Sequence, residues 1–453
     1  MSDLTQTQRA ALAELLSRCP TAMLAKVDAM AATLGGPKAA TLRRLAALEA
    51  QNRDRCDLVM APLAPLFHPR ADRLPGLNFP PEVKGRLWSL TLGHEPAMLK
   101  ALDRGDQVSR TVADRLCLTA AMEVRDHAAI IWPEANPDQI ENLAGCLDLA
   151  GILRRHLGHM DEWLRGGTAA ATADLKFAMK QAAAIDEAAP RRLLEILFAH
   201  SPDARYFLRL LGQILPLVGR EPGLEEAHIH SFNHRLINGL SQRCEAVVAF
   251  DPCRPGADLR ALRDPLQWAA DVMAEFDAQT LVRPDAVDGK RLRQARHEVS
   301  AAIGRHLLKV EALVLALLPV KQTVMIGKMK RPMPQLDQPL DDTMVAQAKV
   351  LLSLVALCRG PASVFGREAD RRQTAESLTW RLASWADEAL ERLNDGGLED
   401  EALACQRISL AADFLALIEA REAARSIRRR LMALANRREH LSAATMDPSP
   451  QFA

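Results

Sequence analysis

The chain is poor in aromatic residues, which make up 4% of its 453 residues and include a single tyrosine. Strands are usually rich in aromatic and β-branched residues, and no segment shows a convincing two-residue alternation of apolar and polar positions. Alanine, leucine, arginine and glutamate dominate instead, and these residues favour helix. The sequence therefore predicts an all-α protein.

Long apolar runs are also missing. The longest, at 312–320 and 350–358, have about half of the roughly 20 residues that span a bilayer. The first ten residues are polar and lack the basic start and apolar run of a signal peptide. The eight cysteines are scattered without close pairs, which favours reduced thiols. These features predict a cytoplasmic protein without a transmembrane segment.

No common catalytic or nucleotide-binding motif is present. The sequence has no glycine-rich phosphate loop, no Cys-x-x-Cys pair, no His-Glu-x-x-His and no Gly-x-Ser-x-Gly. Its 58 basic residues nearly balance its 57 acidic ones, so no overall field attracts nucleic acid or an anionic membrane. Of the basic residues, 46 are arginine and 12 lysine; this bias and the abundant alanine are typical of a GC-rich bacterial genome.

Proline interrupts the helical pattern in three stretches, because it lacks an amide donor and clashes with the preceding turn. The first stretch, from Pro62 to Pro81, contains Phe67 and Phe79, which are expected to pin it as an ordered segment. We find no internal repeat, so the expected architecture is an irregular multi-helix bundle or a degenerate helical solenoid. The predicted segments are N-terminal helices at 1–68, a proline-rich connector at 69–81, a central helical body at 82–318, a Met- and Pro-rich basic loop at 319–340, a C-terminal helical hairpin domain at 341–444 and a disordered tail at 445–453.

The strongest helical pattern lies at the end of the chain. Apolar residues spaced by three or four run from Leu410 to Leu434, close to a heptad seam. A second stripe runs from Leu378 to Leu393, and Asn-Asp-Gly-Gly at 394–397 separates the two. The pattern predicts a long αα-hairpin. A third stripe, at 292–317, includes His306, which we interpret as a hydrogen-bonded core histidine.

One segment carries three histidines within seven residues. Glu226, His230 and His234 recur every four residues, so on a helix they share one face and offer a carboxylate and two imidazoles to a divalent metal. The alternative is that they form the solvated side of an amphipathic helix, since a metal site in a bundle also needs ligands from a second helix. The apolar side of that helix would be Ile229, Phe232, Leu236 and Leu240.

The clearest charge asymmetry lies near the C-terminus. Residues 421–438 contain seven arginines and one glutamate, a local net charge of +6. An anionic partner would explain this charge: an acidic protein surface, nucleic acid or acidic lipid. The alternative is a solvated face whose arginines stabilise the C-terminus of a helix. Because no aromatic residues are interleaved to stack on bases, a protein partner is favoured. The candidate contact residues are Arg421, Arg425, Arg428, Arg429 and Arg430.

The Met-rich basic loop supplies a second candidate surface. Lys328, Met329 and Lys330 combine charge with the flexible, polarisable side chain used at adaptable protein surfaces. The alternative is a boundary loop that packs against a core.

Together these patterns favour a cytoplasmic helical scaffold or regulatory protein that binds a protein partner or itself through its C-terminal hairpin and basic loop. Two other hypotheses remain open. One is a metal-dependent enzyme centred on Glu226, His230 and His234, with a divalent metal as its cofactor. The other is binding of nucleic acid or an acidic membrane by the arginine-rich helix.

Overall fold

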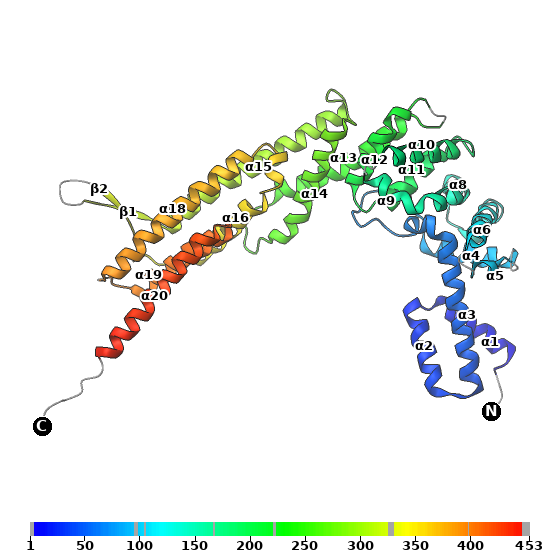
Figure 1. Cartoon of the computed structure of the whole chain (residues 1–453), viewed down its shortest axis with the longest axis horizontal. Helices are drawn as coiled ribbons and strands as arrows, with labels where there is room; N and C mark the ends of the chain where they lie inside the picture. Colours follow the sequence, from blue (N-terminus) through cyan, green and yellow to red (C-terminus); the bar gives the residue numbers. More distant parts are fainter. Residues whose placement is uncertain are drawn as a thin grey trace. The chain divides into compact units, whose positions relative to one another are not determined.

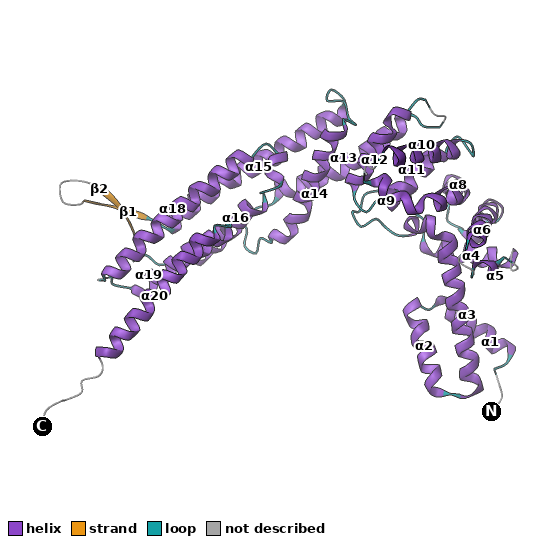
Figure 2. Cartoon of the chain, in the orientation of Figure 1, coloured by secondary structure: helices purple, strands orange, loops and turns teal. Residues whose placement is uncertain are grey.

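The computed structural model describes residues 4–94, 98–103, 106–165, 168–220, 223–324, 330–396 and 398–445. Helices account for nearly all the regular structure in these ranges, and the strands among them form one short hairpin (Figure 2). The prediction of an all-α multi-helix protein is confirmed. Within the described residues, no helix is both long and apolar enough to cross a bilayer.

The chain divides into two compact units, Met1–Arg235 and Leu236–Ala453. The division falls within α13 (Glu226–Ala249). It does not coincide with the predicted boundaries at 69–81 and 319–340, which stay predictions.

The first unit contains short and medium helices packed pairwise, among them α6 against α8 and α8 against α11 (Figure 1). Its first three helices share a small core of Leu16, Leu24 and Ala46. The elements are α1 (Gln6–Arg18), α2 (Thr21–Leu34), α3 (Gly36–Met60), η1 (Ala61–Phe67), α4 (Pro81–His94), α5 (Leu99–Leu102), α6 (Gln107–Asp126), α7 (Ala128–Ile131), α8 (Pro137–His156), η2 (Leu157–His159), α9 (Met160–Leu164), α10 (Ala169–Ala183), α11 (Ala189–His200), α12 (Ala204–Ile214) and η3 (Leu215–Leu217).

The first proline-rich stretch is ordered, as predicted. It begins as the 3-10 helix η1 and continues as irregular chain to the start of α4. Phe67 and Phe79 are both 1% exposed, and their ring centroids lie 5.8 Å apart. Trp132 packs edge-on against Phe79 at 6.0 Å. The two phenylalanines therefore fix a segment whose prolines prevent α-helix.

The second unit is built from long helices (Figure 1). Its elements after α13 are α14 (Leu259–Gln279), α15 (Val287–Leu317), β1 (Val320–Val324), β2 (Lys330–Pro334), α16 (Asp342–Leu357), α17 (Pro361–Val364), α18 (Glu368–Asp395), α19 (Glu401–Leu417) and α20 (Arg421–Thr445). The last three pack on one another, α18 with α19, α19 with α20 and α18 with α20. Aspartate caps three of the helix starts: Asp258 accepts from the amide of Arg260, Asp341 from those of Thr343 and Met344, and Asp400 from that of Leu403.

The long αα-hairpin is present as α18 and α19, but the apolar stripe at 410–434 does not lie on one helix. The chain reverses at 418–420, where Glu419 has a left-handed backbone with φ of 69°. The Ala420 amide donates to the Leu415 carbonyl across this turn, at 2.9 Å. Phe414 on α19 and Ile427 on α20 are both buried. The heptad spacing of apolar residues continues across the turn because α19 and α20 bury their apolar stripes against each other.

The expectation that 319–340 is a loop without strands was wrong. β1 and β2 pair antiparallel from Val320 opposite Pro334 to Val324 opposite Lys330. A further bond from the Gln335 amide to the Pro319 carbonyl, at 2.9 Å, closes the base of the hairpin. An isolated pair of strands tolerates the prolines of β2, because edge strands leave some amides unpaired in any case.

One buried arginine joins separate parts of the second unit. Arg407 on α19 is 2% exposed. It donates to the carbonyl of Leu317, the last residue of α15, at 2.8 Å and to that of Gln338 at 2.6 Å. A cation at a helix C-terminus interacts favourably with the helix dipole. Burial lowers the pKa of Arg407 from its ordinary value, so the guanidinium depends on these carbonyls to replace water.

We expect Arg407→Met to lower the free energy of unfolding by about 3 kcal/mol, because hydrogen bonds to a charged group contribute about 1.5–3 kcal/mol each and the carbonyls would be left unpaired. Urea unfolding followed by circular dichroism measures this loss. The matched control is Arg428→Met, which breaks a half-exposed ion pair with Asp413 and should cost less than about 1 kcal/mol. An equal loss of unfolding free energy in the two variants would contradict the structural role of Arg407.

His306 is not the hydrogen-bonded core histidine that the sequence predicted. Its stripe on α15 is buried as expected, but neither ring nitrogen has a hydrogen-bond partner. The ring lies beside a small cavity shared with Leu351, Val355 and Cys358. Burial lowers the pKa of His306, the charges of Lys309 and Arg305 lower it further, and Asp251 raises it.

We expect His306→Leu to stabilise the fold by about 1–2 kcal/mol, because an unpaired buried polar group is costly. Since the folded pKa is lowered, the unfolded chain takes up the proton first. Stability should therefore fall as the pH drops below about 6.5, and the substitution should remove this contribution. Urea unfolding at about pH 8 and about pH 5 measures both effects. The control is His297→Leu, at an exposed position of α15. If both variants changed the unfolding free energy and its pH dependence equally, the unpaired ring of His306 would not be the cause.

Candidate functional site

Helix α20 carries the five arginines predicted to contact a partner. Its buried side, with Ala424 and Ile427, packs in the three-helix group. Arg428 forms an ion pair with Asp413 of α19 at 2.6 Å, and Arg430 pairs with Asp387 of α18. These two arginines therefore hold α20 against its neighbours from either side. Both pairs are about half exposed, so each contributes only about 0.2–1 kcal/mol.

The other three arginines lie on the outer face of α20. Arg421, Arg425 and Arg429 are exposed, and the described residues provide no ion pair for any of them. Spaced by four residues, successive members lie about 6 Å apart along the helix. Met432, 67% exposed, continues the same face, which also carries Glu422. The result is a stripe of three unpaired cations that ends in one exposed apolar side chain.

The position of the helix start changes how this charge is understood. The alternative explanation was that the arginines stabilise a helix C-terminus. Because the chain reverses at 418–420, Arg421 is instead the first residue of α20 and Arg425 lies one turn further. The helix dipole is positive at this end and disfavours cations there. The part of the alternative that concerns the helix C-terminus is therefore wrong for these two arginines, whereas the expected solvated face is present, because both side chains are exposed.

The predicted contact surface on the basic loop is only partly within the described residues. Lys328 and Met329 lie outside them. Lys330 is the first residue of β2, where it pairs with Val324. Arg392 on α18 donates to the Pro334 carbonyl and ties the base of the hairpin to that helix.

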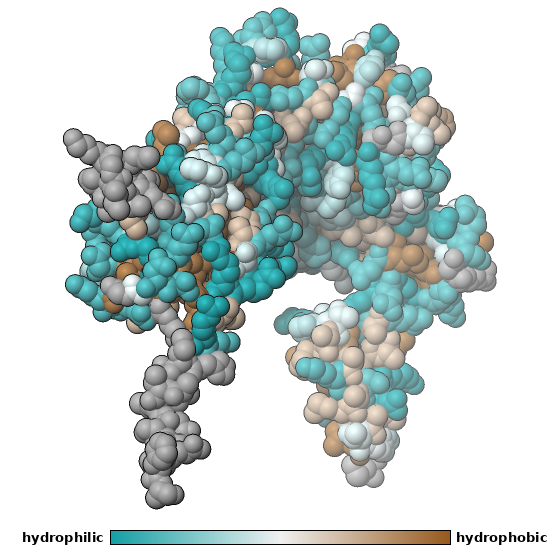
Figure 3. Space-filling view, turned by 60° about the vertical axis from the view of Figure 1, so that its left-hand side comes forward, coloured by the Kyte–Doolittle hydropathy of each residue, from teal (hydrophilic) through white to brown (hydrophobic). Residues whose placement is uncertain are grey.

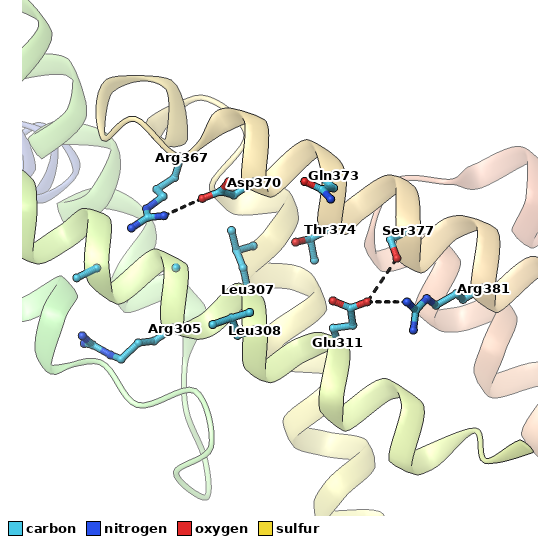
Figure 4. Close-up of a pocket in the computed structure, with 12 residues that line it drawn as sticks. Arg305, Leu307, Leu308, Glu311, Arg367, Asp370, Gln373, Thr374, Ser377 and Arg381 are labelled. Atoms are coloured by element: carbon cyan, nitrogen blue, oxygen red, sulfur yellow. Dashed lines mark hydrogen bonds and ion pairs between the residues drawn. The ribbon is translucent and has the colours of Figure 1, made fainter.

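A groove between α15 and α18 was not predicted from the sequence (Figure 4). It has a volume of about 660 Å³, and the two helices run in the same direction along it. Arg367 at one end pairs with Asp370 at 2.8 Å. At the other end Glu311 accepts from Ser377 at 3.4 Å and pairs with Arg381 at 3.2 Å. No local pattern reveals this site, because its walls come from segments about 60 residues apart.

The charges of this groove largely satisfy one another. Two ion pairs neutralise four of its five charged groups, and Arg305 is left without an ion pair among the described residues. Leu308, 74% exposed, lines the groove between its two charged ends (Figure 4). The arrangement is suited to a polar or weakly anionic segment with one apolar group, and it lacks the convergent unpaired groups of a catalytic site.

An apolar surface lies on the N-terminal helices, which show extensive tan and brown areas in Figure 3. Three large side chains of α2 are exposed: Met23 by 45%, Met30 by 65% and Leu34 by 76%. They are spaced by seven and four residues and lie on one side of the helix. Nothing in the described structure covers them.

The Glu/His stripe of α13 faces solvent. Glu226, His230 and His234 are all exposed, whereas Ile229, Phe232, Leu236 and Leu240 on the other side are buried. The predicted amphipathic helix is confirmed and begins at Glu226. Among the described residues, no group of three or more His, Cys, Asp or Glu side chains is arranged to hold a metal ion. Metal binding by this stripe stays a prediction.

Metal analysis of protein purified without an affinity tag tests that prediction. Binding requires stoichiometric zinc, manganese or iron that is lost in the His230→Ala, His234→Ala double variant, because two of the three ligands would be removed. A His297→Ala variant, which alters an exposed histidine outside the stripe, should keep the metal. Metal-free wild-type protein that also fails to take up added Zn²⁺ would contradict the hypothesis.

Comparison with known proteins gives no family model, no curated protein and no solved structure that matches this chain. Its function must therefore be argued from the surfaces described above.

Proposed function

We propose that this chain is a helical scaffold protein that acts through contacts with another protein, and that the outer face of α20 binds an acidic helix. The observation that supports this function is the stripe of Arg421, Arg425 and Arg429. The stripe is exposed and has no ion pair among the described residues, and its first member, Arg421, lies where the dipole of its own helix disfavours positive charge. Carboxylates of a partner would form ion pairs with these arginines and offset the unfavourable interaction with the helix dipole.

The geometry of the stripe favours a helix as the partner. Acidic residues spaced by four on a helix repeat about every 6 Å, the same interval as the arginines. Nucleic acid is a weaker alternative because the face carries no aromatic side chain to stack on bases. A membrane surface is also weaker, since Ala424 and Ile427 are buried in the unit and Met432 is the one large apolar side chain that the described part of α20 exposes.

We also propose that the protein works in the cytoplasm. All eight cysteines are free thiols in the structure. Burial raises the pKa of Cys56, Cys117, Cys146 and Cys358 to about 12, so these thiols are unreactive core residues. Free buried cysteines are compatible with a reducing compartment.

Binding of a labelled helical peptide to the full chain tests the proposed function. The peptide carries glutamates at three positions spaced by four, and its matched control carries glutamines. We expect the acidic peptide to bind in a fluorescence anisotropy titration and to dissociate in about 1 M salt, where the screening length is about 3 Å. The triple variant Arg421→Gln, Arg425→Gln, Arg429→Gln should bind at least about tenfold more weakly, because three ion pairs are lost.

The control protein removes three exposed arginines elsewhere, by Arg44→Gln, Arg260→Gln and Arg263→Gln. It has the same net charge as the α20 variant, and we expect it to bind the peptide like wild type. Equal weakening in both variants would show a general charge effect and defeat the proposal. Tighter binding to a duplex DNA of about 20 base pairs than to the peptide would defeat it in favour of nucleic acid.

A further inference from the structure

Helix α18 carries an acidic stripe with the same spacing as the arginine stripe of α20. Asp387, Glu391 and Asp395 are exposed and recur every four residues. Asp387 already pairs with Arg430. Glu391 and Asp395 have no ion pair among the described residues. The second unit therefore presents two stripes of opposite charge and equal repeat, one on each of two neighbouring helices.

The outermost residue of each stripe lies at a helix end where the dipole disfavours its charge. Asp395 is the last residue of α18 and Glu391 lies one turn before it. The C-terminal end of a helix is negative and disfavours carboxylates, as the positive N-terminal end of α20 disfavours Arg421 and Arg425. Each stripe would therefore gain from an opposite charge placed against it from outside.

The far ends of the two stripes cannot reach each other within one chain, whereas their near ends lie together at the Asp387–Arg430 ion pair. The chain reverses once between α18 and α19 and again between α19 and α20, so α18 and α20 run in the same direction. Their contact between Asp387 and Arg430 fixes how far one helix is displaced along the other. Arg421 lies nine residues before Arg430, and Asp395 lies eight residues after Asp387. At 1.5 Å per residue, Arg421 and Asp395 are about 25 Å apart along the helices.

We propose, building on the proposed function, that the acidic helix that docks on α20 is α18 of a second copy of this chain. In an antiparallel arrangement Arg421 faces Asp395, Arg425 faces Glu391 and Arg429 faces Asp387, all in one register. The positive end of α20 then meets the negative end of α18 in the second copy. Arg421 and Arg425 gain carboxylates that have no ion pair among the described residues, and Arg429 shares Asp387 of the second copy with Arg430 of that copy. The antiparallel dipoles of the paired helices also interact favourably.

Apolar contacts extend the same register. It brings Trp380, which is 71% exposed on α18, to within one helical turn of Met432 of the other copy, which is 67% exposed. Thioether and aromatic groups pack favourably at this range. The tryptophan and the methionine are among the most exposed large apolar side chains of the second unit, and the antiparallel pairing covers both.

Each copy contributes both stripes, so the contact can be two-fold symmetric. Under a two-fold axis the contact of α20 with α18 of the other copy occurs twice, and these helices also lie beside their own counterparts in the other copy. Only the outward residues of α18 and α20 take part, which makes a small contact surface. A standard interface uses about 20–30 residues a side, so the expected dimer is weak, reversible and sensitive to salt.

Sedimentation equilibrium of the full chain tests the inference through charge reversal. Wild type should dimerise reversibly at low salt and dissociate in about 1 M salt. The variant Arg421→Glu, Arg425→Glu and the variant Glu391→Arg, Asp395→Arg should each dimerise at least about tenfold more weakly, because each places like charges opposite one another. An equimolar mixture of the two variants should dimerise like wild type, since both contacts of the mixed pair recover opposite charges.

Recovery in the mixture also shows that the two variants are folded. A dimer that both charge variants retain, but that Met30→Glu, Leu34→Glu abolishes, would overturn the inference and assign self-association to α2. A wild type that stays monomeric at low salt would also overturn it. If that monomer still binds the acidic helical peptide through α20, the proposed function stands with a different partner; if it does not, both proposals fail.

Discussion

Arginine side chains that reach the free carbonyl groups at the ends of neighbouring helices are the contacts on which the packing of this chain depends. The last four carbonyls of a helix have no partner within it, and a forked guanidinium can bind two acceptors while its charge complements the dipole. Arg407 reaches the end of α15 in this way. Arg154 on α8 binds the Leu58 and Val59 carbonyls near the end of α3, each at 2.7 Å. Arg53 on α3 binds the Leu16 and Ser17 carbonyls near the end of α1.

This structural use of arginine separates the arginines that hold the fold from those that remain for a partner. A high arginine content on its own resembles the signature of a nucleic-acid-binding protein. Here many guanidinium groups are occupied by carbonyls or carboxylates of the same chain. On the outer face of α20, Arg421, Arg425 and Arg429 are instead exposed, have no ion pair among the described residues and recur every four residues along one helix. The meaning of a basic helix thus depends on which of its charges the fold has already neutralised.

The turn at 418–420 has the largest effect on the functional interpretation. If the last apolar stripe lay on one helix, Arg421 would sit in its interior and the arginines would lie towards a helix C-terminus, where they need no partner. The left-handed backbone of Glu419 starts a new helix and reverses the sign of the dipole near Arg421. It also folds α20 back so that it runs alongside α18. One residue therefore determines both the direction of the basic helix and the position of its charges.

The sequence by itself determined the helical class, the buried stripes of α13 and α15 and the anchoring of the proline-rich stretch by Phe67 and Phe79. These features follow from residue propensity and from periodicity along one segment, which are local properties. The tertiary structure alone decided the reversal at Glu419, the β1–β2 hairpin, the unpaired ring of His306 and the groove between α15 and α18. No glycine or proline marks the reversal at Glu419. The heptad spacing of apolar residues continues from α19 into α20. Such features are set by contacts between segments distant in the chain, so the energy that selects them appears only when the helices pack together.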